Sequence, residues 1–370
     1  MNPELSTYLN MLRVLAALAV FVGHICIWRV DCGFVDRLPW LGGDGVVIFF
    51  VLSGYVVAYT ADTKDKTARA FMINRCARIY SVMVPALILT VALELVGIRY
   101  FSETYNALFD HYQVQKLWLY IPLWLSFSSE LWGLNEPMLT NGAFWSLCFE
   151  VWFYVFLALS LFMRGAERVV AMIIAPLIVG PKICLLFPLW GLGVLAYRAQ
   201  KKISLKPVPA RLLFLLSVGA YLLIKANGFD TMATEGVNNA FGNVPRHYLQ
   251  VAYNFPGHFI IAVCVATSIF AMRFTALRQI ASVAYPVGFV ASFTFTIYLT
   301  HLPLMKFFVA LGGPAMESMF WPTLATLAAV VALGSVTERR IGPWRTLFAR
   351  LFRVGDRVAG NAALATRRGV

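Results

Sequence analysis

The sequence predicts an all-α integral membrane protein with about ten transmembrane helices and both termini in the cytoplasm. Of its 370 residues, 60% are hydrophobic and 13% are charged, and the mean hydropathy is +0.72. A soluble domain carries about 45–50% apolar and about 25% charged residues, so this chain cannot cover a soluble fold of its size with polar surface. Its apolar residues also stand in runs of about 20, the length at which a helix crosses the hydrocarbon core.

Ten apolar runs reach or approach this spanning length. The fifth and sixth are short and close together, so they form either a tight hairpin of two spans or a re-entrant pair. Two connections, 98–143 and 227–255, are longer than usual, and the aromatic residues of the first predict elements lying at the membrane interface. The predicted spans are 9–28, 43–60, 79–97, 144–163, 167–181, 183–197, 211–226, 256–272, 287–308 and 319–337.

The Lys and Arg residues predict the orientation of these spans. With the N-terminus in the cytoplasm, most of the 31 fall in inner segments, above all 61–78, 198–211 and the region after residue 338. This pattern follows the positive-inside rule. We therefore expect a polytopic membrane domain, 1–343, and a basic cytoplasmic tail, 344–370, that binds anionic lipid.

Charge and cysteine content exclude two other classes of protein. The net charge of +13 comes from short clusters between apolar runs, so we expect the lipid bilayer and not nucleic acid as the partner. The six cysteines stand singly with no CxxC spacing, so neither a metal site nor a disulfide framework is predicted.

The few ionisable side chains within the spans are the first candidates for function, because burying one in lipid costs about 2.5–3.5 kcal/mol or more. From the predicted helix starts, His24, Glu150 and His301 each lie about 21–22 Å from the inner boundary of a core about 30 Å thick. Three separate helices thus place ionisable groups in one layer, which predicts one shared site. At the span edges stand Arg13, Asp44, Arg75 and Arg78.

Arg13 and His24 lie on one stripe of the first helix. They are eleven positions apart, so they are about 20° apart around the helix and about 16 Å apart along it. An anionic donor held near Arg13 would therefore present its reactive end to His24.

Five motifs occur in order along this frame, and together they resemble acyltransferase family 3, the bacterial membrane O-acyltransferases, from about residue 8 to residue 343. The motifs are Arg13 to His24 in NMLRVLAALAVFVGH; the glycine-rich stretch Gly42–Tyr55, which holds Asp44 and Ser53; Arg75 and Arg78 in NRCARIY; Trp145, Ser146, Leu147 and Glu150 in FWSLCFEVWFY; and Ser292, Tyr298, Leu299 and His301. The glycines Gly42, Gly43, Gly45 and Gly54 predict either a close helix approach or a broken helix.

The resemblance implies transfer of an acyl group, commonly acetyl, from cytoplasmic acyl-coenzyme A (acyl-CoA). The acceptor it implies is a hydroxyl of a cell-surface glycan or a lipid-linked molecule outside the cytoplasm. It also implies a multi-pass protein of the bacterial inner membrane without a tightly bound cofactor. Acyl-CoA, acetyl-CoA in the commonest case, is then a substrate.

The resemblance also implies roles for the candidate residues. His24 would act as general base, with Glu150 orienting its imidazole, although an acyl-histidine intermediate is equally open. Arg13, Arg75 and Arg78 would bind the phosphates of the donor. Further substrate or structural residues are expected to be Asp44, Ser53, Trp145, Ser146, Tyr298 and His301.

Two other classes of function remain open. A proton-coupled secondary transporter would use His24, Glu150 and His301 as a proton relay. The chain lacks the paired interrupted helices in matching halves that usually mark such transporters. A structural or assembly partner of a glycan export system would need none of the three buried ionisable side chains.

Overall fold

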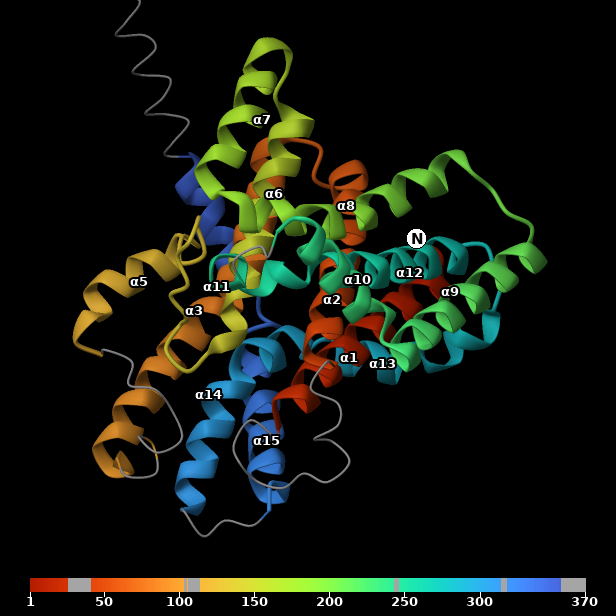
Figure 1. The fold of residues 1–370 in the computed structure, drawn as a ribbon. Coiled ribbons are helices and arrows are strands. Elements are labelled where there is room, and N and C mark those ends of the chain that lie inside the picture. The colour runs from red at the N-terminus through yellow and green to blue at the C-terminus, as the bar shows by residue number, and fades with distance from the viewer. Residues whose placement is uncertain (26–40, 103–104, 106–113, 243–245, 314–317, 354–370) are drawn as a thin grey trace, which may run out of the picture.

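A computed structural model describes residues 1–25, 41–102, 105, 114–242, 246–313 and 318–353 (Figure 1). The described part is helical and contains no strand. The elements are α1 (Pro3–Ile25), α2 (Leu41–Thr63), α3 (Ala68–Tyr100), η3 (Val114–Lys116), α5 (Leu117–Leu125), η4 (Gly142–Phe144), α6 (Trp145–Phe162), α7 (Gly165–Val179), α8 (Pro181–Lys202), α9 (Pro207–Asn227), α10 (Phe229–Ala240), α11 (Arg246–Leu249), η5 (Gln250–Asn254), α12 (Phe255–Met272), η6 (Arg278–Val283), α13 (Ala284–Ala291), α14 (Thr294–Gly312) and α15 (Phe320–Val336).

The all-α membrane fold class is confirmed, whereas the count of ten spans is not. In the described part, eight helices have the length and hydropathy to cross a membrane. Each of the ten predicted runs overlaps a helix, but 167–181 and 319–337 correspond to α7 and α15, which have only 15 and 17 residues. The last residues of the predicted span 9–28, and residues 354–370 of the predicted tail, lie outside the described part.

The predicted single span 287–308 is wrong, because the chain turns at Ser292 and Phe293 between α13 and α14. The carboxylate of Glu338 accepts hydrogen bonds from the backbone N–H of Thr296, at 2.9 Å, and from its hydroxyl, at 3.1 Å. This carboxylate, from the end of another helix, therefore satisfies a backbone donor in the first turn of α14.

Helix α3 begins well before the predicted span 79–97. The hydroxyl of Thr67 caps it by accepting from the backbone N–H of Ala70 at 3.2 Å. Arg75 and Arg78 therefore lie on a helix, where we expected an inner loop. Because they are three positions apart, they share one face of α3.

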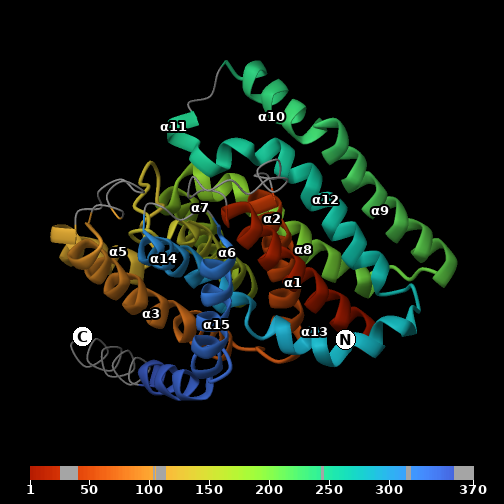
Figure 2. The ribbon, with the colours of Figure 1, turned by 90° about the horizontal axis from the view of Figure 1, so that it is seen from below.

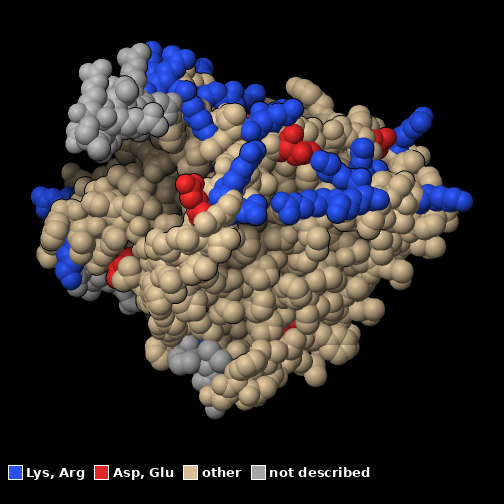
Figure 3. All heavy atoms as spheres, turned by 90° about the horizontal axis from the view of Figure 1, so that it is seen from above, with Lys and Arg blue, Asp and Glu red and all other residues tan. Residues whose placement is uncertain are grey.

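The charged residues lie mainly on one side of the molecule. The N-terminal end of α1 and a helix at residues 342–353, which we call the C-terminal helix, lie opposite α10 and α11 (Figure 2). Lys and Arg gather along one edge, and most of the remaining visible surface carries no charge (Figure 3). This one-sided distribution agrees with the orientation predicted from the sequence.

Helix α2 is continuous and packs closely against both α1 and α8. At Gly45, a Cβ atom would lie 2.7 Å from the carbonyl oxygen of Ala16, so only glycine permits this approach to α1. The glycines of α2 therefore bring backbones together and do not break the helix. The resulting packing places α1, α2, α3, α6 and α14 around one interior space.

Candidate active site

A cavity of about 400 Å³ lies between α1, α2, α3, α6, α14 and the C-terminal helix. Lys64 and Asp65, just beyond the C-terminal end of α2, line it on the side of the basic loop 64–67. Phe49, Ser146 and Tyr298 line its other end. The cavity therefore extends from a charged loop into the interior of the helix bundle.

Five cationic side chains but only two carboxylates, Asp65 and Glu150, line this cavity. Two of the cations are ion-paired, one with the Asp65 carboxylate and one with that of Glu338. Within the described residues, the other three have no carboxylate partner, so the cavity carries an excess of positive charge. The cations are Arg13, Lys64, Arg75, Arg78 and Arg345.

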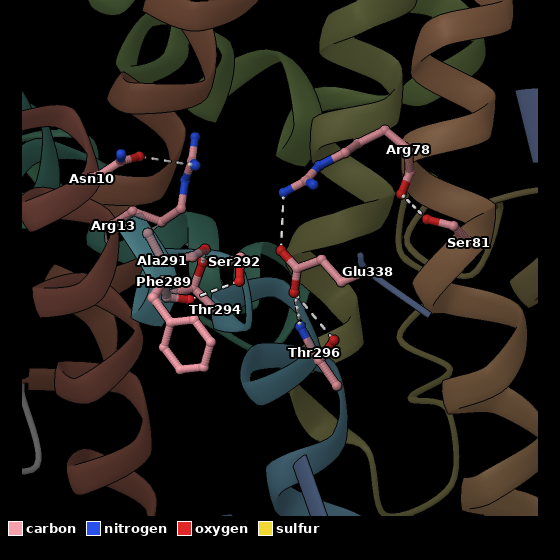
Figure 4. A network of polar contacts seen from close by, with 10 residues as sticks. All are labelled: Asn10, Arg13, Arg78, Ser81, Phe289, Ala291, Ser292, Thr294, Thr296 and Glu338. Atoms are coloured by element: carbon pink, nitrogen blue, oxygen red, sulfur yellow. Dashed lines mark hydrogen bonds and ion pairs between the residues drawn. The ribbon is translucent and has the colours of Figure 1, made fainter. Parts of the chain in front are cut away.

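Arg13 and Arg78 approach from helices on opposite sides (Figure 4). The guanidinium of Arg78 lies 3.1 Å from the Glu338 carboxylate, which also holds the first turn of α14. Arg13 donates only a long hydrogen bond, 3.5 Å, to the amide oxygen of Asn10. Arg75, on the same face of α3 as Arg78, lies 3.3 Å from the Asp65 carboxylate.

Glu150 lines the same cavity and is held by hydroxyl groups. Its carboxylate accepts a short hydrogen bond from Ser53 and one of 2.5 Å from Tyr154. The indole N–H of Trp190 in turn donates to the Ser53 hydroxyl at 3.2 Å. Because Tyr154 stands one helical turn after Glu150, α6 supplies both the carboxylate and one of its donors.

Tyr298 and Ser146 close the interior end of the cavity. Their hydroxyl groups form a short hydrogen bond, and the Tyr298 hydroxyl donates to the carbonyl oxygen of Ala143 at 3.1 Å. The ring of Phe49 packs edge-on against Tyr298, with 5.4 Å between ring centroids. These three side chains separate the cavity from the polar groups beyond it.

A pair of histidines lies beyond Tyr298. The Nδ1 atom of His24 is 3.3 Å from Nε2 of His301, which stands one turn after Tyr298 on α14. His301 Nδ1 lies 2.9 Å from the carbonyl oxygen of Ile297, and His24 Nδ1 lies 2.7 Å from that of Val20.

These carbonyl contacts determine where the neutral rings carry their protons. A carbonyl oxygen can only accept, so Nδ1 of each imidazole must donate. The Nε2 atom of His301 is then an acceptor facing the Nδ1–H of His24. His24 keeps an unprotonated Nε2, the state that a general base requires.

The structure divides the predicted site residues into those that line the cavity and those that do not. His24 and His301 contact each other but do not line it. The expected contact between Glu150 and His24 is not formed, because Glu150 bonds to the hydroxyls described above. The predicted residues that line the cavity are Arg13, Ser53, Arg75, Arg78, Ser146, Glu150 and Tyr298.

Two predicted residues lie elsewhere. Asp44 accepts from the Tyr221 hydroxyl at 3.0 Å and pairs with Lys225 at 3.4 Å, near the start of α2 and away from the cavity. Trp145 packs its ring against Phe50 and Phe149, with centroids 6.3 and 5.3 Å apart. Asp44 and Trp145 therefore stabilise helix packing.

Sequence reasoning missed several residues of the cavity. Tyr154 was detectable, because its spacing from Glu150 places both on one face of a helix. Glu338 does not line the cavity but pairs with Arg78, and it was also detectable as the carboxylate directly after a predicted span. Arg345 lies in the predicted tail, where a basic residue is more simply explained by lipid binding.

A family model described as "Acyltransferase domain" matches residues 6–339, which is most of the chain. Two curated proteins are also similar. The chain is 34% identical over 123 residues to "Exopolysaccharide production protein ExoZ" of Rhizobium meliloti (strain 1021) and 26% identical over 180 residues to "Nodulation protein 10" of Rhizobium leguminosarum bv. viciae. The matched stretches are 33% and 45% of this chain and 35% and 47% of those relatives. No solved structure matches the chain significantly.

Proposed function

The chain belongs to the acyltransferase family, and on that premise we propose that it moves an acyl group, most simply acetyl, from cytoplasmic acyl-CoA to a hydroxyl of an extracytoplasmic glycan or lipid-linked acceptor. The observation that carries this proposal is the cavity, which has an excess of cations near the basic loop and ends beside two histidines. A bacterial inner membrane would place acyl-CoA on the side of that loop.

The cations of the cavity suit the phosphate groups of coenzyme A. Guanidinium groups bind phosphate through paired, charge-assisted hydrogen bonds, and Arg13, Arg75 and Arg78 line the cavity. A volume of about 400 Å³ is in the usual range for a small-molecule site. The closed end at Phe49 and Tyr298 favours a short acyl group over a long chain.

The name of one of the two relatives supports a carbohydrate acceptor. One is described by exopolysaccharide production and the other by nodulation. We therefore propose a hydroxyl group of a surface or secreted glycan as the acceptor for this chain. Neither name describes the acyl donor, so the two relatives do not bear on the proposal that acyl-CoA is the donor.

The histidine pair supplies the proton chemistry of this proposal. The Nε2 of His24 takes the proton of the acceptor hydroxyl while the hydroxyl oxygen attacks the thioester carbonyl carbon. The C–S bond then breaks, and the imidazolium returns the proton to the leaving thiolate. The His24 Nδ1–H faces two acceptors, the Val20 carbonyl oxygen at 2.7 Å and His301 Nε2 at 3.3 Å, and together they would stabilise the imidazolium, the role that the sequence had suggested for Glu150.

An acyl-histidine route uses the same atoms. His24 Nε2 then attacks the thioester carbonyl carbon, and coenzyme A leaves as a thiolate. The acceptor hydroxyl next displaces the imidazole from the acyl group, and its proton goes to the coenzyme A thiolate. In both routes the hydrogen bond between Tyr298 and Ser146 must open, because these side chains stand between the cavity and His24.

The decisive experiment uses purified full-length protein in lipid nanodiscs and follows thiol release from acetyl-CoA. His24→Ala should abolish release and transfer while the thermal midpoint stays unchanged, and His247→Ala in an outer segment is the matched control. Full activity of the His24→Ala variant would rule out both catalytic roles proposed for His24. A wild-type protein that never releases thiol in the presence of a glycan extract would favour the transporter instead.

Mass spectrometry of surface glycans from cells with and without the gene would identify the acceptor. An acyl modification missing from the deleted strain is expected. Identical glycans in both strains would contradict a glycan acceptor.

A further inference from the structure

Part of the cavity wall comes from a region that the family model does not cover. That model ends at residue 339, whereas Ile341 and Arg345 line the cavity. Arg345 belongs to the C-terminal helix, residues 342–353, which was expected to be a tail bound to lipid. The donor site therefore has a component that family membership does not assign.

Two contacts hold the C-terminal helix in place. The ring of Phe348 packs against that of Tyr80 on α3, with centroids 5.3 Å apart, and the Tyr80 hydroxyl donates to the carbonyl oxygen of Leu125 at 2.7 Å. Glu338, just before the helix, is fixed by Thr296 and by Arg78. Both ends of the segment from 338 to 348 are thus attached to helices that line the cavity, and Figure 4 shows the contacts of Glu338.

The sequence of the C-terminal helix fits an element lying along the protein surface. Its partly buried apolar residues recur at helical spacing, at Ile341, Trp344, Phe348 and Phe352. Leu347 and Leu351 are exposed on another side. Arg345 is exposed but lines the cavity, whereas Arg350, which is also exposed, does not line it.

Arg345 is well suited to bind an anion. Its guanidinium has no carboxylate partner among the described residues, whereas Arg75 and Arg78 share their charge with Asp65 and Glu338. The positive charge that Arg345 brings is therefore uncompensated by protein groups at the cavity.

We propose that the C-terminal helix completes the donor site and that Arg345 binds the phosphate groups of the coenzyme A moiety. This inference rests on the proposed function, because it takes acyl-CoA as the donor. An anionic lipid headgroup offers the same phosphate chemistry, so the test must separate these two sources.

The test compares two donors in full-length protein in zwitterionic nanodiscs. Acetyl-pantetheine carries the thioester but lacks the 3′-phospho-ADP part of acetyl-CoA. Arg345→Gln should raise the KM for acetyl-CoA, and the Kd for coenzyme A measured by calorimetry, by about fivefold, as expected for one exposed charge-assisted contact. The KM for acetyl-pantetheine should not change.

Arg350→Gln is the matched control, because it removes the same charge from the same helix outside the cavity. It should leave both donors unaffected. Phe348→Ala should reproduce the effect of Arg345→Gln by releasing the helix from Tyr80. Thermal midpoints establish that each variant is folded.

Equal effects of Arg345→Gln and Arg350→Gln would overturn the inference, as would equal effects of Arg345→Gln on the two donors. An effect seen only in anionic nanodiscs would assign Arg345 to the lipid and overturn it too. If the wild type does not turn over acetyl-CoA, the proposed function fails. The Kd values for coenzyme A still decide the role of Arg345 in that case.

Discussion

Three largely buried lysines outside the cavity and the cations of the cavity differ in how their charge is balanced. Lys182, Lys225 and Lys306 each contact a carboxylate, at 3.0, 2.6 and 3.1 Å, and their side chains are only 0%, 11% and 1% exposed. In the cavity, Arg13, Lys64 and Arg345 have no such partner within the described residues.

This difference separates charges that serve the fold from charges available to a ligand. Burying one charge costs several kcal/mol, so a lysine in the bundle needs a fixed carboxylate beside it. The proposed anionic donor would instead balance the excess of cations in the cavity. The two regions should therefore respond differently to mutation, one in stability and the other in donor binding.

The largest effect should come from Lys306→Met, outside the cavity. The ammonium group lies 3.1 Å from Glu94 and 3.9 Å from the Tyr105 ring centroid, and Glu94 also accepts from Thr140 at 3.0 Å. Removing the cation leaves a buried carboxylate without its partner, which costs about 3–5 kcal/mol. Thermal and urea denaturation in detergent would measure the loss.

The double variant Glu94→Gln with Lys306→Met is the control, because removing both charges should recover much of the stability. The KM for acyl-CoA should stay unchanged in both. A raised KM without a loss of stability would place Lys306 in a ligand site and contradict the distinction between lysines that stabilise the fold and cations that bind the donor.

An effect of intermediate size, on the KM for acyl-CoA, is expected from Arg75→Lys combined with Arg78→Lys. Each lysine keeps a positive charge beside Asp65 or Glu338, so the free energy of unfolding should hardly change. Because the variant lacks the planar guanidinium groups that bind phosphate through two parallel hydrogen bonds, the KM for acyl-CoA should rise by about tenfold. Steady-state thiol release measures it; an unchanged KM would remove both residues from the donor site.

The sequence predicted the fold class and the helix positions well because both depend on local apolar content. It did not reveal the break before α14, where hydropathy stays high and the stabilising carboxylate, Glu338, is 42 residues from Thr296. Depth along each helix suggested that His24, Glu150 and His301 share a site. Depth alone does not say which of the three touch.

Arg345 shows the same limit at the cytoplasmic side. A basic residue in a tail is explained by lipid unless its contacts are known. Only the packing of Phe348 on Tyr80 places Arg345 at the cavity, and no spacing in the sequence encodes a contact between such distant residues.

The smallest effect should come from Lys64→Gln at the end of the cavity beside the loop 64–67. Lys64 is exposed and lines the cavity without a carboxylate partner in the described part of the chain, so water and salt screen its attraction for the donor. We expect the KM for acyl-CoA to rise about twofold at low salt and the difference to vanish near 1 M salt. The effect of Arg75→Lys with Arg78→Lys on the KM depends on hydrogen-bond geometry more than on net charge, so it should persist at about 1 M salt.

Lys66→Gln on the same loop is the matched control, because Lys66 is exposed but lies outside the cavity, and this variant should have no effect on the KM. If Lys66→Gln and Lys64→Gln raise the KM equally, the attraction arises from the whole basic face, and the contrast between the cavity and the paired lysines weakens.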